Sequence, residues 1–120
     1  AMAYGIVTAG YVLARLETMP IVDVRPAPYY EESRIPHALS VPMLAVKELG
    51  GDVAAEMARR VRELGIRETD DAIVYCMNGG LAREACGLLE SQGYAHLHCY
   101  EGSWVDWVSD PTRPVERSFV

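Results

Sequence analysis

The chain has 120 residues, a length at which one domain can bury a substantial core. Its net charge of -6 at pH 7 argues against nucleic acid as a partner, because few basic side chains are free to neutralise phosphates. Half of the residues are hydrophobic, but they form no apolar run near the length of about 18 residues that a membrane span needs. We therefore expect a single soluble domain over residues 1–120, with its core at about 8–110 and no signal peptide.

Two further features of the composition bear on where the protein works. The three cysteines are too few for a disulfide framework, which favours a reducing compartment, and we expect the cytoplasm. Ala1 precedes Met2 and is interpreted as a possible remnant of an expression tag.

Strand and helix patterns alternate along the chain. Helices are expected at about 9–17, 53–64, 81–92 and 103–110, the first two capped by Thr8 and Asp52 and the last opened by a capping box of Ser103 and Asp106. Residues 26–42 contain four prolines and are expected to form a long loop with at most one helical turn. Short apolar runs predict strands at about 4–7, 21–24, 38–41, 72–75 and 96–100. This alternation predicts an α/β fold with a central parallel five-stranded sheet and helices on both faces.

The most informative stretch follows the fourth predicted strand. Ala72 to Tyr75 is apolar, Cys76 ends it, and the turn-forming residues Asn78, Gly79 and Gly80 lead into a helix. Amides in such a loop and the positive end of the helix dipole form a concavity that binds anions and stabilises a thiolate. We therefore expect the Cys76 thiol to be presented at the carboxyl edge of the sheet, where ligands of parallel sheets collect.

Other polar residues have simpler interpretations. Asp23 lies in an apolar strand and needs a partner, for which Arg25, on the same face, is a candidate. Cys86 and Cys99 are interpreted as core residues, while His96 and His98 share a strand face and leave a metal site as an open alternative.

Several motifs, in order along the chain, resemble those of the rhodanese family of sulfurtransferases. Ile21 to Arg25 is similar to that family's strand ending in Asp-x-Arg, and Val74 to Ala82 to its active-site cysteine loop. Further similar segments are Ser33 to Leu39, Leu88 to Tyr94, and Tyr100 to Trp104, so the resemblance runs from about Thr8 to Trp107. Leu81 departs from the pattern, because the family commonly has Arg, Thr or Ser there.

The resemblance implies the three-layer rhodanese-like fold and a reaction in which sulfane sulfur passes through a Cys76 persulfide. The donor would be thiosulfate, polysulfide or a similar small molecule, and the acceptor a thiol or a cyanide-like nucleophile. It implies Cys76 as the catalytic residue and Asp23 and Arg25 as supporting residues. Substrate binding would fall to Met77, Asn78, Gly79, Gly80, Leu81 and Ala82. No metal or organic cofactor and no membrane partner is expected, and the protein would be a monomer or a weak homodimer.

Two alternatives stay open. Cysteine phosphatases, and arsenate reductases on this scaffold, use an Arg six residues after the cysteine; here that position is Ala82, and Arg83 comes one residue later. A shift of one residue turns a helical side chain by about 100°. The second alternative is a non-catalytic module in which Cys76 is a redox sensor or a relic.

Overall fold

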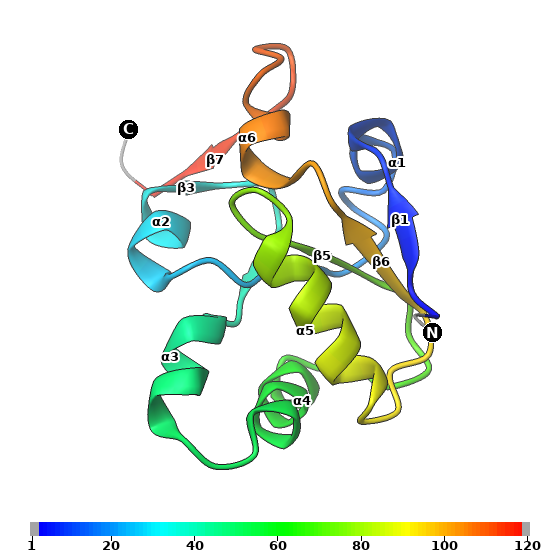
Figure 1. Ribbon diagram of the computed structural model, residues 1–120. Coiled ribbons are helices and arrows are strands. Elements are labelled where there is room, and N and C mark those ends of the chain that lie inside the picture. The colour runs from blue at the N-terminus through cyan, green and yellow to red at the C-terminus, as the bar shows by residue number, and fades with distance from the viewer. Residues whose placement is uncertain (1–2, 119–120) are drawn as a thin grey trace.

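The computed structural model describes residues 3–118 and contains the predicted parallel sheet (Figure 1). Its strands are β1 (Gly5–Val7), β2 (Ile21–Asp23), β4 (Leu39–Ser40), β5 (Ala72–Tyr75) and β6 (Leu97–Tyr100). They are ordered β1-β6-β5-β2-β4, and every pair is parallel. The five-stranded parallel α/β fold is therefore confirmed, and β5 is its central strand.

The helices are α1 (Ala9–Leu13), α2 (Ala27–Glu32), α3 (Met43–Leu49), α4 (Val53–Glu63), α5 (Gly80–Glu90) and α6 (Ser103–Trp107). The predicted side-chain caps at Thr8 and Asp52 are confirmed. Thr8 accepts a hydrogen bond from the backbone N–H of Tyr11, and Asp52 accepts one from that of Ala55. Among the described residues, none of these helices combines the length and the apolar character needed to cross a bilayer.

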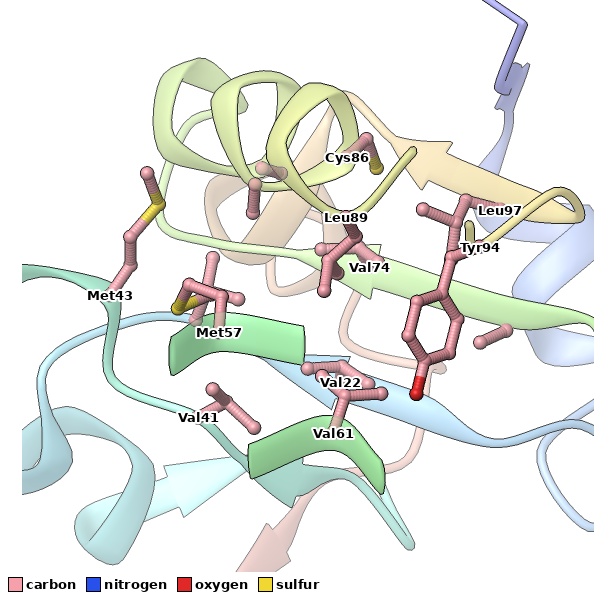
Figure 2. Close-up of a cluster of buried hydrophobic side chains, with 14 of the residues drawn as sticks. Val22, Val41, Met43, Met57, Val61, Val74, Cys86, Leu89, Tyr94 and Leu97 are labelled. Carbon is pink, nitrogen blue, oxygen red and sulfur yellow. The ribbon is translucent and has the colours of Figure 1, made fainter. Parts of the chain in front are cut away.

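The sheet separates two hydrophobic cores. On one face α3, α4 and α5 cover a core that includes Met43, Met57 and Leu89 together with Val74 of β5 (Figure 2). On the other face α1 and α6 cover a core that contains Val12 and Trp107. Because side chains alternate along a strand, β5 contributes to both cores, and the chain after it leaves the sheet from a buried position.

Four features differ from the expectations. Helix α1 ends at Leu13, and residues 14–18 form turns in place of the predicted continuation to residue 17. Helix α2 has six residues where at most one turn was expected, and α3 was not expected at all. Finally, β3 (Ser33–Arg34) pairs antiparallel with β7 (Glu116–Arg117) to form a second sheet. These elements are short, and their stability comes from contacts that no local pattern contains.

Candidate active site

The candidate site lies at the carboxyl end of β5, between the ends of β2 and β6. Cys76 directly follows Tyr75, the last residue of β5, and residues 77–79 connect it to α5. The neighbouring strands end at Asp23 and Tyr100. The residues that follow all three strand ends therefore meet at one edge of the sheet, which is the usual ligand position in such folds.

Two backbone amides point at the Cys76 sulfur. Gly79 N–H donates to Sγ over 3.1 Å, and Ala82 N–H donates over 3.3 Å. Gly79 is the N-cap residue of α5 and Ala82 lies in its first turn, so the positive end of this eleven-residue helix faces the sulfur. This arrangement favours a negative charge on that atom.

The other loop residues have different positions. The Met77 carbonyl accepts a hydrogen bond from the Val105 N–H at 3.0 Å, and Asn78 Oδ1 accepts one from the Gly80 N–H at 3.4 Å. Leu81 is partly buried and packs against the core between the sheet and α5. The structure thus places two of the predicted substrate-binding amides on the sulfur itself.

The conformation of Gly79 requires glycine. Its φ of +102° lies in the region that other residues avoid, and a Cβ at this position would lie 2.3 Å from the Glu101 carbonyl oxygen. The close approach of these two segments brings the chain after β6 against the cysteine loop.

The Cys76 side chain is more covered than the sequence suggested. The residue is only 1% exposed, whereas we expected a thiol presented to solvent. The expectation of an open thiol is therefore wrong. The start of α5 and the segment after β6 both form hydrogen bonds to Cys76, and Leu81 packs against the core cluster that contains it. A donor can reach the sulfur only if part of this cover moves.

The start of α6 is attached to Cys76 by two hydrogen bonds and to Met77 by one. Trp104 N–H donates to the Cys76 carbonyl, and Val105 N–H to that of Met77, each at 3.0 Å. Ser103 Oγ accepts from the Cys76 N–H at 3.1 Å. The predicted capping box at Ser103 is wrong: α6 has no side-chain cap, because this hydroxyl is directed at Cys76.

Asp23 and Arg25, at the carboxyl end of β2, form the predicted ion pair. The Arg25 Nη2–Asp23 Oδ2 distance is 2.7 Å, and both side chains are buried. Arg25 Nη2 also donates to the Ser33 carbonyl, and its Cζ lies 4.5 Å from the centre of the Trp104 ring. Burying these charges is tolerable because each is paired and hydrogen-bonded.

Tyr75 joins this ion pair to the cysteine strand. Its hydroxyl donates to Asp23 Oδ2 at 2.5 Å and accepts from the Ile35 N–H at 3.2 Å. Burial, followed by the adjacent Asp23 charge, raises the pKa of Tyr75 far above its ordinary value, so the phenol stays protonated. The network fixes the residue immediately before Cys76.

Arg83 does not extend over the sulfur. Its Nη1 lies 3.4 Å from Glu101 Oε2, and both side chains are about half exposed. The sequence analysis did not identify Glu101 as a site residue. A signal was available, because Glu101 directly follows a strand that lies beside the central strand, and such positions adjoin the ligand site of a parallel sheet. Because Glu101 holds Arg83, the geometry does not supply the oxyanion clamp of a cysteine phosphatase.

The other cysteines and the histidines lie apart from this chemistry. Cys86 and Cys99 are buried free thiols, and the Cys99 thiol, with burial, raises the pKa of Cys86. His98 Nε2 lies 2.8 Å from Asp71 Oδ1, while His96 is exposed. Within residues 3–118, no three potential metal-binding side chains of the His, Cys, Asp or Glu types gather into a group.

Comparisons with known proteins show the family of this chain. The profile of the Rhodanese-like domain matches residues 8–110. A sulfurtransferase from Allochromatium vinosum is 27% identical over 95 residues, which cover 79% of this chain and 77% of that protein. A probable 3-mercaptopyruvate sulfurtransferase from Pseudomonas aeruginosa is 37% identical over 49 residues, which are 41% of this chain but only 17% of the relative.

Solved structures share the fold. The Alr3790 protein from Anabaena superposes with a TM-score of 0.75 at 23% identity, covering 95% of this chain and 94% of that one. The protein EanB, in a complex described as ergothioneine covalently linked with a persulfide cysteine, superposes with a TM-score of 0.78 at 25% identity. That match covers 95% of this chain but 28% of EanB.

Proposed function

Because this chain belongs to the rhodanese-like domain family, we propose that it transfers sulfane sulfur from a small donor to a nucleophilic acceptor through a persulfide on Cys76. The observation that carries the proposal is the pair of amides, Gly79 N–H and Ala82 N–H, that donate to the Cys76 sulfur. Hydrogen bonds to an ionised acceptor are stronger than those to a neutral one, so this pair can stabilise charge that the sulfur carries during the reaction.

In the first step, the Cys76 thiolate attacks the outer sulfur of the donor. A bond forms between Sγ and that sulfur, and the rest of the donor leaves with the electron pair of the broken bond. The product is a Cys76 persulfide, whose inner sulfur stays within reach of the two amides. Such a covalent intermediate divides the transfer into two easier displacements.

In the second step, a thiolate or a cyanide-like nucleophile attacks the outer sulfur of the persulfide. The bond to Sγ breaks, and Cys76 leaves as the thiolate that the amides stabilise. The same donors thus assist the sulfur as nucleophile in one step and as leaving group in the other. No net oxidation or reduction by an outside reagent is required.

The charges near the site bear on the choice of donor. Two basic side chains that adjoin the site are already paired, Arg25 with Asp23 and Arg83 with Glu101. Leu81 contributes no hydrogen-bond donor from its side chain. We propose that polysulfide or an organic persulfide is a better donor than thiosulfate, whose sulfonate-like oxygens need hydrogen-bond donors that the Leu81 side chain does not supply.

Access to the sulfur is part of the proposal. With Cys76 only 1% exposed, part of the cysteine loop or of the segment after β6 that contacts it has to move for each turnover. Loops of this kind move on timescales of about microseconds to milliseconds, which is fast enough for ordinary turnover.

The test is the intact mass of the protein after incubation with polysulfide, with thiosulfate, and with a mercaptan sulfur donor. We expect a gain of one sulfur that a thiol acceptor removes, and no gain in the Cys76→Ser variant. Cys99→Ala is the matched control and should still gain the sulfur. If the unmodified protein gains no sulfur from any donor, or if Cys76→Ser gains it equally, the proposal is wrong.

A second measurement separates an enzyme from a non-catalytic module. Iodoacetamide should label Cys76 of the native protein below neutral pH, because the thiolate is the reactive form. Labelling only after denaturation would show that the cover does not open, and would favour the non-catalytic alternative.

A further inference from the structure

Ser103 has a backbone conformation that a serine normally avoids. Its φ is +60°, a left-handed value that is costly for residues with a Cβ, by about 1–2 kcal/mol. It is also 0% exposed, so water does not hydrate its hydroxyl in the folded protein. Strain of this kind persists only where the surrounding structure enforces it, and it often marks a functional position.

The hydroxyl of Ser103 lies among three polar groups. It accepts a hydrogen bond from the Cys76 N–H at 3.1 Å and donates to the Tyr100 carbonyl at 2.8 Å. Its Oγ is also 3.8 Å from Cys76 Sγ, in an orientation that allows donation to sulfur. A hydroxyl has one proton, so the Tyr100 carbonyl and the Cys76 sulfur compete for it.

We propose that Ser103 is a third hydrogen-bond donor to the Cys76 sulfur, used when that sulfur is negatively charged. With a neutral thiol, the carbonyl at 2.8 Å is the better acceptor. When Sγ becomes a thiolate, its charge makes it the stronger acceptor, and rotation of the hydroxyl moves the proton toward it. The proton stays covalently bonded to Oγ throughout, so only the hydrogen bond to the Tyr100 carbonyl is exchanged.

This role rests on the proposed function, because charge returns to Sγ when the persulfide is consumed. The two amides come from the loop and α5, whereas Ser103 approaches from α6. The sulfur is thereby held from two elements that are distant in the sequence. The hydrogen bond that the Cys76 N–H donates to Ser103 Oγ keeps the hydroxyl beside the sulfur in either orientation.

The test compares Ser103→Ala with Ser103→Gly. Both remove the hydroxyl, but alanine keeps the Cβ at positive φ, while glycine relieves that strain and is the variant more tolerant of the backbone conformation. The readout is the pH profile of Cys76 alkylation by iodoacetamide. We expect the midpoint to rise by about one pH unit in both variants, so that alkylation below the midpoint is about tenfold slower.

The charged groups around the sulfur are common to both variants. They are Asp23 and Arg25 at the end of β2, Arg83 on α5, and Glu101 before α6, each in an ion pair. An unchanged midpoint in both variants would overturn the proposal. A shift in Ser103→Gly alone would also overturn it, since it would trace the effect to the backbone and not to the hydroxyl.

A measurement on the unaltered protein does not depend on whether the variants fold. The Tyr100 carbonyl loses its hydrogen bond when the hydroxyl rotates, so its carbonyl-carbon resonance should shift with the alkylation midpoint. A resonance that does not respond to pH across that midpoint would contradict the proposal. Neither experiment uses a sulfur donor, so failure here is distinguishable from failure to transfer sulfur.

Discussion

Replacing Gly79 with alanine tests whether the close approach of the cysteine loop and the segment after β6 organises the site. The new Cβ would lie 2.3 Å from the Glu101 carbonyl oxygen, well under the 3.0 Å below which something must shift. The obstructing atom belongs to the backbone, so it cannot rotate away as the end of a side chain would.

The magnitude follows from two costs. A residue other than glycine at the φ of +102° loses about 1–3 kcal/mol, and forcing the backbones apart adds about 1–3 kcal/mol. We therefore expect Gly79→Ala to lower the free energy of unfolding by about 2–6 kcal/mol, a large part of a typical domain's stability. The same shift moves the Gly79 N–H away from Cys76 Sγ, so iodoacetamide labelling at acid pH should slow as well.

Gly80→Ala is the matched control. Its Cβ would meet only Asn78 Oδ1 at 3.8 Å, an ordinary contact, and its φ is not positive. Because alanine also restricts the unfolded chain, we expect a change of at most about 1 kcal/mol, in the stabilising direction. Urea unfolding of the three proteins measures these values. Equal effects of the two substitutions, or a Gly79→Ala protein as stable as the parent, would refute the reasoning.

Three further predictions concern the groups around the loop. Asp23→Asn leaves the Arg25 charge buried without its partner, and should lower the free energy of unfolding in urea by about 3–5 kcal/mol. Glu101→Gln releases Arg83 for an anionic donor, and should raise kcat/KM for thiosulfate about two- to fivefold, a small effect because the pair is half exposed. The fold raises the pKa of Tyr75 above its ordinary 10.0. The stabilisation of the folded state by the neutral Tyr75 phenol is therefore complete below pH 10 and is lost as the pH rises further. Tyr75→Phe should therefore reduce the alkaline loss of stability by up to about 1.4 kcal/mol per pH unit above 10 in pH-dependent urea unfolding.

Each of these predictions has a control at an exposed position. Arg59→Ala breaks only exposed ion pairs and should cost about 1 kcal/mol or less. Glu84→Gln removes the partner of Lys47 and should leave thiosulfate activity unchanged, while Tyr29→Phe should leave the alkaline slope unchanged. If a control substitution has as large an effect as its test substitution, the interaction removed by the test substitution is not the cause of that effect.

Much of the fold could be predicted from local patterns. The strands at Ile21 and Ala72 are short apolar runs bounded by polar or turn residues, and Asp52 is a cap followed by a clear amphipathic helix. The missed α3 had one available signal, because Pro42 precedes it and Gly50 follows it. By contrast, β3 and β7 pair Ser33 with Arg117, and only the folded chain brings these residues together.

The candidate site also combines features that local sequence could predict with features that it could not. The position of Cys76 before a glycine loop and a helix is a local property, as is the pairing of Asp23 with Arg25 two residues later. The roles of Ser103 and Glu101 are not local, since both depend on β6 lying beside β5. The burial of Cys76 was also missed, because the covering groups come from separate parts of the chain.

Local patterns along the chain were enough to predict the parallel α/β sheet, the cysteine at its carboxyl edge and the helix whose amides face that cysteine. These features follow from hydrophobic periodicity, glycine conformation and capping, all of which act over a few residues. The folded arrangement was needed to see that the sulfur is covered, that Ser103 Oγ lies 3.8 Å from it, and that Glu101 pairs with Arg83. The reason is that these contacts join the chain after β6 to the chain after β5, and their formation depends on the order of strands in the sheet.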